Sequence, residues 1–437
     1  MTGFFSWLAT TWSSVLSPVI STVLFFGVAI VLTLITRFAQ IRAFPRFMRL
    51  ITGTIQEFKD EKKTDAINPF HALFAAMATT LGMGNIVGPG IAILTGGPGA
   101  LFWLIVYIFF ASATKFTEVV FALETRTISA DGKIMGGPMR YLHTISPFLA
   151  RWYTYFALIL FVGFSMLQSN TLANIYALES LPKPAIGAVL AMIVFITLRG
   201  GAQRVGDIAS KLVPIMFVLY IVFAIILLSR NLHALGDAIA LVLSSAFSSK
   251  AALGCFAGAS VMHAMQAGVY KAIFITEAGI GTSSIPHAMA ATKRPVDQGI
   301  LAMFSMISDA IISITSGLLV LVMGLCNGPF RSTMIYEAFK MGSPVAGRFV
   351  LLATVTLFVV TTVIGNAFNG MQTFTSLTRY RWLHSYIALT VGMIFIAPLI
   401  ETQYAWAIMD VILAFVAIPN IIGLVILAYK KPEVLKV

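Results

Sequence analysis

Long apolar runs recur along the whole chain, and only short polar segments separate them. A helix that crosses a bilayer needs roughly 20 mostly apolar residues, and glycine, proline and charged residues mark where such helices begin and end. The pattern predicts an all-α polytopic membrane protein with about eleven transmembrane helices. We expect them at residues 17–36, 67–94, 98–123, 150–178, 184–199, 206–229, 249–275, 300–325, 346–373, 382–398 and 404–429.

Two of the predicted helices contain a helix-breaking cluster. The second contains LGMGNIVGPG (Leu81–Gly90), and the seventh contains LGCFAGAS (Leu253–Ser260). Glycine and proline interrupt the hydrogen bonds of a helix and leave backbone groups that lipid cannot bind. Non-helical backbone inside a membrane is therefore tolerated only where it lies against protein or a water-filled cavity. Both clusters therefore predict broken helices at a binding site. The alternative is that these glycines only allow close helix packing.

The two clusters lie five helices apart, and this spacing predicts the domain organisation. Two five-helix repeats of opposite orientation, each led by its broken helix, are typical of secondary transporters that bind their substrate near the membrane midplane. An N-terminal transmembrane helix and a cytoplasmic loop would occupy residues 1–66. The first repeat would span 67–229, and the second repeat with a cytoplasmic tail would span 230–437.

The basic residues add the orientation in the membrane. The chain is 58% hydrophobic and 11% charged, and its formal net charge is +12. Its Lys and Arg residues are scattered over short loops and form no basic stripe, which argues against a nucleic-acid partner. Cytoplasmic loops collect Lys and Arg, so we expect a multi-pass protein of the cell (inner) membrane with the N-terminus outside and the C-terminus cytoplasmic. Six of the 29 Lys and Arg residues then lie on the outer side: Lys183, Arg230, Lys250, Arg331, Lys340 and Arg348.

Six motifs follow one another along nearly the whole chain. They are LGMGNIVGPGIAILTGGPGALFW (81–103), ATKFTEVVFALETR (113–126), GGPMRYL (136–142), LQSNTLA (167–173), FAGASVMHAMQAGVYKAIFITEAGIGTSSIPHA (256–288) and AIPNIIGL (417–424). Together they resemble the alanine or glycine:cation symporter family. The resemblance implies the leucine-transporter fold of the amino acid/polyamine/organocation superfamily. It also implies symport of a small neutral amino acid such as alanine or glycine, with a sodium ion as co-substrate and no cofactor.

The chain departs from the family pattern at several positions. Met83 stands where the family usually has Thr, His71 where it has Gln, and Thr276 where it has Asn. In the eighth core helix, Asn366 replaces an aromatic residue near the substrate and Met371 replaces an acid. An asparagine in place of tryptophan predicts a wider, more polar pocket. The alternative function is therefore proton-coupled transport of a larger or more polar amino acid.

Candidate substrate residues follow from the two charges of an amino acid. Backbone N–H groups at the N-terminus of a half-helix, where the helix dipole is positive, can hold the carboxylate. The ammonium needs acceptors from unwound carbonyls or from amide side chains. For the amides of the fourth predicted helix, interhelical hydrogen bonding is the alternative role. The candidates are Gly84, Asn85 and Ile86 for the carboxylate, and Phe256, Ala257, Gly258, Gln168 and Asn170 for the ammonium, with Asn366 beside the substrate.

Candidate cation ligands are placed by the resemblance. The superfamily has a cation site between the first and eighth core helices, which corresponds here to Thr80 and Gly82 at the first break and to Thr361 and Thr362. Hydroxyl and carbonyl oxygens are ligands that a hard cation prefers. For the two residues of the eighth core helix, hydrogen bonding to their own helix is the alternative.

Ionisable residues inside membrane segments are functional candidates by default. Asp309 and Asp410 are the clearest carboxylates, and Asp309 is the candidate for proton coupling. Lys115 and Glu118 are expected to pair near an inner helix end. We interpret Glu277, together with Lys271, as an inner-gate or loop-anchoring group. The histidines show no ligand spacing that would indicate a metal site.

Two other functional classes have weaker support in the sequence. An intramembrane enzyme would need clustered catalytic groups, and the chain contains neither HExxH nor GxSxG. A channel would favour rings of pore-lining residues over paired broken helices. A cation-coupled symporter is therefore the function that the sequence favours.

Overall fold

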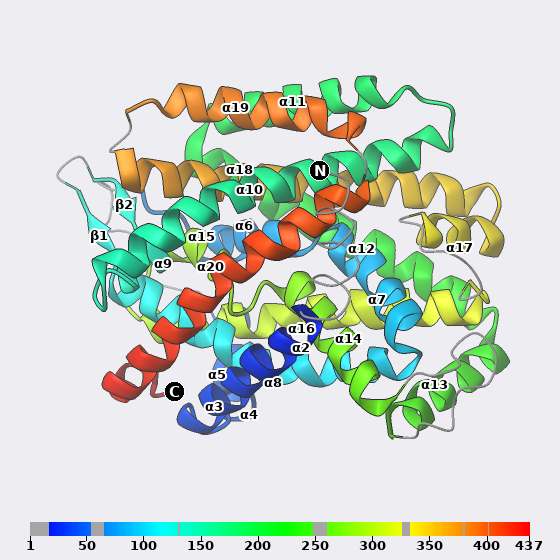
Figure 1. Ribbon diagram of the computed structural model, residues 1–437, viewed down its shortest axis with the longest axis horizontal. Coiled ribbons are helices and arrows are strands. Elements are labelled where there is room, and N and C mark those ends of the chain that lie inside the picture. Colours follow the sequence, from blue (N-terminus) through cyan, green and yellow to red (C-terminus); the bar gives the residue numbers. More distant parts are fainter. Residues whose placement is uncertain are drawn as a thin grey trace.

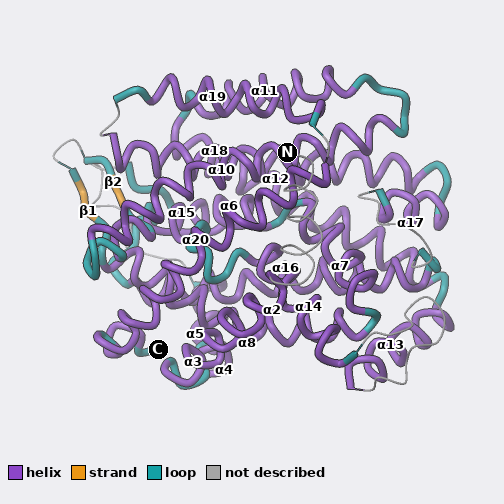
Figure 2. Tube along the Cα trace, in the orientation of Figure 1, coloured by secondary structure: helices purple, strands orange, loops and turns teal. Residues whose placement is uncertain are grey.

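The protein is described here by a computed structural model, in which helices make up almost all of the chain (Figures 1 and 2). The structure describes residues 17–53, 65–129, 132–247, 260–325, 333–378, 381–400 and 402–437. Two short strands, β1 (Thr127–Ile128) and β2 (Ile134–Met135), form an antiparallel hairpin. Seven described helices are long and apolar enough to cross a membrane, and one bent helix pair forms an eighth such span.

The predicted spans correspond to helices of the structure. The first is α2 (Ser17–Ser21), a π-helical turn (Thr22–Phe26) and α3 (Gly27–Ile35). The others in the first half are α6 (Pro69–Thr80) with α7 (Met83–Gly96), α8 (Gly99–Glu124), α10 (Pro147–Ala177), α11 (Lys183–Leu198) and α12 (Gly201–Ser229). In the second half they are α14 (Val261–Thr276), α16 (Pro295–Val322), α18 (Ala346–Thr378), α19 (Leu383–Ile396) and α20 (Thr402–Lys430).

Several short helices lie between these spans, and the apolar pattern did not predict them. They are α4 (Ala39–Arg42), α5 (Phe44–Thr52), α9 (Pro138–Tyr141), α13 (Leu232–Phe247), α15 (Ser284–Ala288), α17 (Met334–Gly342) and two 3-10 turns (Ala397–Leu399 and Pro432–Leu435). Figure 1 places α9 and the β-hairpin at one end of the bundle and α13 and α17 at the other.

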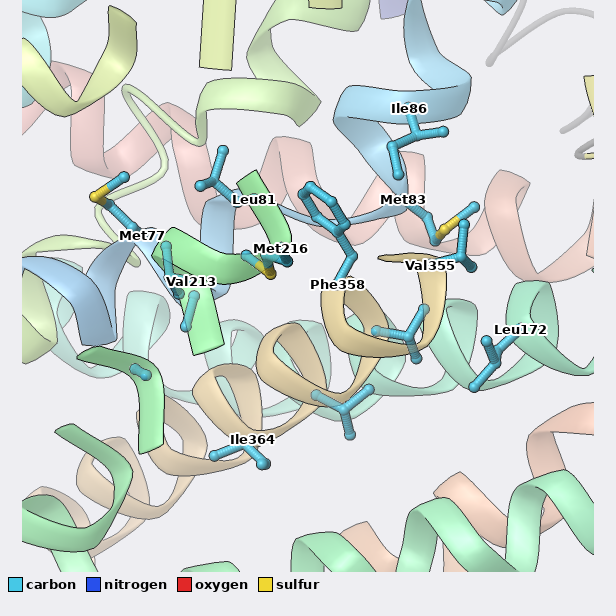
Figure 3. Close-up of a cluster of buried hydrophobic side chains, with 14 of the residues drawn as sticks. Met77, Leu81, Met83, Ile86, Leu172, Val213, Met216, Val355, Phe358 and Ile364 are labelled. Carbon is cyan, nitrogen blue, oxygen red and sulfur yellow. The ribbon is translucent and has the colours of Figure 1, made fainter. Parts of the chain in front are cut away.

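The first predicted break is confirmed. Helix α6 ends at Thr80, α7 begins at Met83, and the two axes differ by 41°. We call residues Leu81 and Gly82 the first break. Figure 3 shows Leu81 and Met83 close to Phe358 of α18, and these apolar side chains belong to one large buried cluster. Packing on both sides of the break therefore fixes the bend.

A second interruption among the described residues lies between α14 and α15. The predicted break at Leu253–Ser260 falls, except for Ser260, outside the described residues. The structure shows an interruption at residues 277–283, between α14 and α15, which we call the second break. Glu277, Gly279 and Gly281 there have φ angles of 54°, 91° and 89°. A Cβ atom at Gly281 would also lie 2.5 Å from Pro138 Cγ, so both backbone conformation and packing require glycine.

Equivalent helices of the two halves pack against each other. Helix α8 contacts α16, α10 contacts α18, and α11 contacts α19, which lies beside it at one edge of the molecule (Figure 1). The fifth helix of each half packs on the third of the other, α12 on α18 and α20 on α10. This reciprocal packing agrees with the predicted five-plus-five arrangement. It places both breaks beside α10 and α18.

Candidate functional site

Polar side chains form hydrogen bonds with the backbone of the first break. Gly82 N–H donates to Asn85 Oδ1 (3.1 Å), and Met83 N–H donates to Gln168 Oε1 of α10 (3.2 Å). The hydroxyl oxygen of Thr362 on α18 lies 3.0 Å from the carbonyl oxygen of Leu81. Backbone groups that the break removes from the helix ladder are thus satisfied by side chains, as burial requires.

Gly82 brings two polar side chains into direct contact with the break. A Cβ atom at this position would lie 2.8 Å from Thr362 Oγ1 and 3.1 Å from Gln168 Nε2. Any larger residue would therefore displace one of these side chains. The absence of a side chain lets α10 and α18 reach the backbone of the break.

A cavity opens beside both breaks. Its empty volume is about 410 Å³, part of which is open to solvent. The lining comes from α6, the first break, α7, α10, the end of α14 and α18. The lining residues are Thr79, Thr80, Gly82, Gly84, Phe164, Leu167, Gln168, Phe274, Glu277, Thr362 and Asn366.

The structure brings together about half of the candidates that the sequence singled out. Thr80, Gly82, Gly84, Gln168, Thr362 and Asn366 all line the cavity. Asn85, Ile86, Asn170 and Thr361 are not among its lining residues. Phe256, Ala257 and Gly258 lie outside the described residues, so their predicted role stays a prediction.

Asn85 and Ile86 lie behind the cavity wall. The Asn85 side chain accepts from Gly82 N–H and donates to Asp309 Oδ1 of α16 (2.9 Å), and the residue is fully buried. Ile86 packs in the hydrophobic core. Asn85 therefore shapes the break by fixing Gly82, and Asp309 anchors Asn85.

Asn170 and Thr361 make the alternative contacts that the sequence left open. Asn170 Nδ2 donates to the carbonyl oxygens of Ala397 (2.9 Å) and Ile400 (2.7 Å), which are interhelical bonds. Thr361 Oγ1 lies 2.8 Å from the carbonyl oxygen of Leu357 in its own helix and 3.4 Å from Met216 Sδ of α12. Thr361 and Asn170 do not line the cavity. Thr362 also makes the within-helix contact, since its Oγ1 lies 2.7 Å from the carbonyl oxygen of Phe358 as well as 3.0 Å from that of Leu81.

Glu277 is a cavity residue that is not among the predicted substrate ligands. The sequence predicts an inner-gate or loop-anchoring group here, and the structure places Glu277 in the cavity lining at the second break, together with Phe274. The Thr282 hydroxyl donates to its carboxylate. The glycines in EAGIG (277–281) were the available signal. The apolar run before them is equally compatible with an ordinary helix end, so local sequence alone does not place Glu277 at the cavity.

The expected pairing of Lys115 with Glu118 takes a different form. Lys115 Nζ donates to the carbonyl oxygen of Thr276 (2.8 Å), the last residue of α14. Glu118 Oε1 accepts from Gly279 N–H (2.9 Å). Both side chains are buried on α8; Lys115 binds the end of α14, and Glu118 binds the second break.

The cavity combines groups that suit a zwitterion and a cation. A buried carboxylate at Glu277 can accept hydrogen bonds from an ammonium group. The N-terminus of α7 begins at Met83, beside Gly84, and favours a negative charge. Hydroxyl groups of Thr80 and Thr362 beside the Leu81 carbonyl are hard oxygen donors. No group of three or more His, Cys, Asp or Glu side chains suited to a metal occurs among the described residues.

The chain is similar in sequence to proteins that are named as sodium symporters. The chain is 32% identical over 420 residues to the sodium/alanine symporter AgcS of Methanococcus maripaludis, with 93% of this chain and 91% of that protein covered. It is 28% identical to the probable sodium/glutamine symporter GlnT of Bacillus subtilis, covering 93% and 85% of the two chains.

Solved structures show the same fold at low sequence identity. The structure of MhsT in complex with L-phenylalanine matches with a TM-score of 0.53 at 14% identity, covering 82% of this chain and 88% of that one. A manganese transporter of Eremococcus coleocola matches with a TM-score of 0.51 at 15% identity, covering 84% and 82%. These matches confirm the predicted leucine-transporter-like fold.

The family model covers almost the whole chain. The model of the sodium:alanine symporter family matches residues 2–437. Its members are transporters and not enzymes, which agrees with a polytopic helical bundle that has a polar cavity between two broken helices. This chain belongs to the sodium:alanine symporter family.

Proposed function

We propose that this chain is a secondary active transporter that couples sodium entry to uptake of a small neutral amino acid such as alanine or glycine. The observation that carries the proposal is the cavity at the first break, where Gly82, Gln168 and Thr362 converge. Two relatives are named for sodium symport, one with alanine and one with glutamine. An amino acid and a monovalent cation are thus the expected partners, with the lipid bilayer as solvent.

The substrate's two charges find complementary groups in this cavity. We assign its carboxylate to the N-terminus of α7 at Gly84, where the helix dipole is positive. We assign its ammonium to the Glu277 carboxylate and the Gln168 amide. A charge-assisted hydrogen bond is stronger than a neutral one, so Glu277 contributes most to holding the substrate.

The cation site proposed at the first break uses neutral oxygen ligands. Thr362 Oγ1 lies 3.0 Å from the Leu81 carbonyl oxygen, and Thr80 lines the same cavity. Oxygen donors of this kind suit sodium. The Thr362 hydroxyl also lies 2.7 Å from the carbonyl oxygen of Phe358 in its own helix. Thr361 has no part in this site, because it does not line the cavity and its hydroxyl lies beside Met216.

A second candidate substrate class is favoured by Asn366. Its side chain is 1% exposed and lines the cavity, and neither amide atom has a hydrogen-bond partner among the described residues. A buried amide without partners costs free energy that a hydrogen-bonding ligand recovers. A substrate with a polar side chain, such as serine, threonine or glutamine, would supply those bonds.

The orientation and the repeats complete the proposal. We assign the N-terminus to the outside and the C-terminus, after α20, to the cytoplasm, because the basic segments between helices then lie inside. The repeats are residues 67–229 and 230–437, with the first 66 residues as an addition. The β-hairpin and α9 would face the cytoplasm, and α13 and α17 the outside.

The testing experiment is uptake into proteoliposomes under separately imposed sodium and proton gradients. A panel of labelled glycine, alanine, serine, threonine and glutamine identifies the substrate. Uptake driven by the sodium gradient alone supports sodium coupling. Uptake that only a proton gradient drives would instead assign the coupling to a proton, with Asp309 as the buried carboxylate beside the first break.

A further inference from the structure

The second break is surrounded by side chains of four other helices. Three come from α8: Lys115 Nζ donates to the carbonyl oxygen of Thr276, Tyr107 OH donates to that of Ala278 (3.4 Å), and Glu118 accepts from Gly279 N–H. The bonds of Lys115 and Glu118 are 2.8 and 2.9 Å long. Tyr153 OH of α10 donates a hydrogen bond to the carbonyl oxygen of Ile280 (3.0 Å). Asn369 Nδ2 of α18 donates one to the carbonyl oxygen of Thr282 (3.2 Å).

Asn420 of α20 completes this set. Its Nδ2 lies 2.9 Å from both the Gly279 carbonyl oxygen and Glu118 Oε1, while its Oδ1 accepts from Tyr141 OH. Gly279 thus has its N–H bound by Glu118 and its carbonyl bound by Asn420. The two side chains also bind each other, and both are fully buried.

A segment with this backbone needs such partners to hold one conformation. Residues with left-handed backbone angles are strained and persist only where the surrounding structure holds them. Backbone N–H and C=O groups outside a helix ladder cost free energy in an apolar interior unless they find hydrogen-bond partners. Side chains on separate helices can satisfy the second break only while those helices keep their positions. Removing one partner leaves a buried donor or acceptor unpaired, which costs more than the bond contributed.

We propose that Glu118 and Asn420 are positioning residues for substrate binding. They fix the peptide groups of Gly279, two residues after Glu277, and thereby aim the Glu277 carboxylate into the cavity. Neither residue lines the cavity, so they act through the second break. Because Asn420 belongs to α20, displacement of α20 also changes the position of Glu277. The inference rests on the proposed substrate site for its functional consequence.

The test measures apparent KM and Vmax for labelled alanine in proteoliposomes under an imposed sodium gradient. Glu118→Ala and Asn420→Ala are each expected to raise KM about 10-fold, since each removes a buried bond involving a charged group. Because the two residues act through one network, the double variant is expected to raise KM about 20-fold, where independent effects would give about 100-fold. Glu118→Gln keeps an acceptor oxygen and is expected to stay within about 3-fold of wild type.

A matched control separates positioning from general stability. Tyr220→Phe removes a buried hydrogen bond to Ser316 (2.7 Å) that involves no residue of either break, and it keeps the aromatic ring that packs against Phe358. It is expected to lower the thermal unfolding temperature without changing KM. The proposal is overturned if Glu118→Ala and Asn420→Ala behave like Tyr220→Phe, with unchanged KM, or if their effects on KM are independent.

A second readout does not depend on transport. Phe274→Cys, in a background that lacks Cys255 and Cys326, reports access to the cavity by its rate of maleimide labelling. Asn420→Ala is expected to change that rate by about 5-fold or more, because the end of α14 shifts when its partners are lost. Tyr220→Phe should leave it unchanged. An unaltered labelling rate in Asn420→Ala overturns the inference even if the chain does not transport alanine.

Discussion

The two breaks of this protein are stabilised in different ways. The first spans two residues, Leu81 and Gly82, and is bound by Gln168 and Thr362, which line the cavity, and by Asn85, which lies behind it. The second spans residues 277–283, and its backbone groups are bound by buried side chains that stay outside the cavity. The first break therefore leaves polar groups at the cavity, whereas the second mainly presents Glu277 and Phe274 there.

In the proposed function, the two breaks therefore have different roles. The first break, whose backbone lies beside hydroxyl groups at the cavity, is proposed to bind the cation and the substrate carboxylate. The second break is proposed to position the Glu277 carboxylate that accepts hydrogen bonds from the substrate's ammonium group. Substitutions at the two places should therefore change different transport parameters.

Asn85→Ala should have the largest effect, because it removes the side chain that fixes Gly82 and leaves Asp309 without its donor. We expect uptake to fall by about 100-fold or more while membrane insertion stays intact, since an unpaired buried carboxylate is costly. Initial uptake rates, normalised to inserted protein, check this. Asn170→Ala is the matched control, since it removes interhelical bonds outside the cavity and should lower thermal stability with KM unchanged. Equal transport loss in both variants would contradict the comparison.

Glu277→Gln tests the second break. The substitution keeps the size of the side chain but removes the negative charge that we assign to the ammonium. Apparent KM for the amino acid should rise about 30-fold, with a much smaller change in sodium dependence. Uptake kinetics at saturating sodium measure the first quantity, and sodium titration at saturating substrate measures the second. A larger shift in sodium dependence would instead place Glu277 at the cation.

Thr362→Ala sharpens the assignment of the cation to the first break. We expect the sodium concentration for half-maximal uptake to rise about 5- to 10-fold, because one oxygen ligand is lost. Thr361→Ala changes the neighbouring threonine, which does not line the cavity, and should leave that concentration unchanged. Identical sodium curves for the two variants would remove Thr362 from the proposed site.

Asn366→Trp should have the smallest overall effect and the most selective one. The larger, apolar side chain fills space in the cavity and removes the unpartnered amide. Uptake of serine, threonine and glutamine should fall relative to alanine by about 10-fold. The reason is that the site loses its hydrogen bonds to the substrate's polar side chain and has less room for it. Competition against labelled alanine measures the ratio. The polar-substrate assignment fails if only glycine and alanine compete in the wild type.

The sequence determined the architecture of this protein. Runs of apolar residues of bilayer length fixed the helical spans, because a spanning segment must satisfy its backbone internally. The glycines around Gly82 marked the first break correctly. Long motifs identified the family, and the family model confirms it over residues 2–437.

Tertiary structure decided which polar groups meet. Thr361 and Thr362 are adjacent in sequence, yet successive helical residues point in directions about 100° apart, so neighbouring helices alone select which one reaches the first break. Glycines at 279 and 281 permit a left-handed backbone, but Lys115, Glu118, Tyr153 and Asn420, which are distant in sequence, make the second break stable. Glu277 becomes a cavity residue through those contacts, since local sequence describes where a helix can end and only packing determines what its end faces.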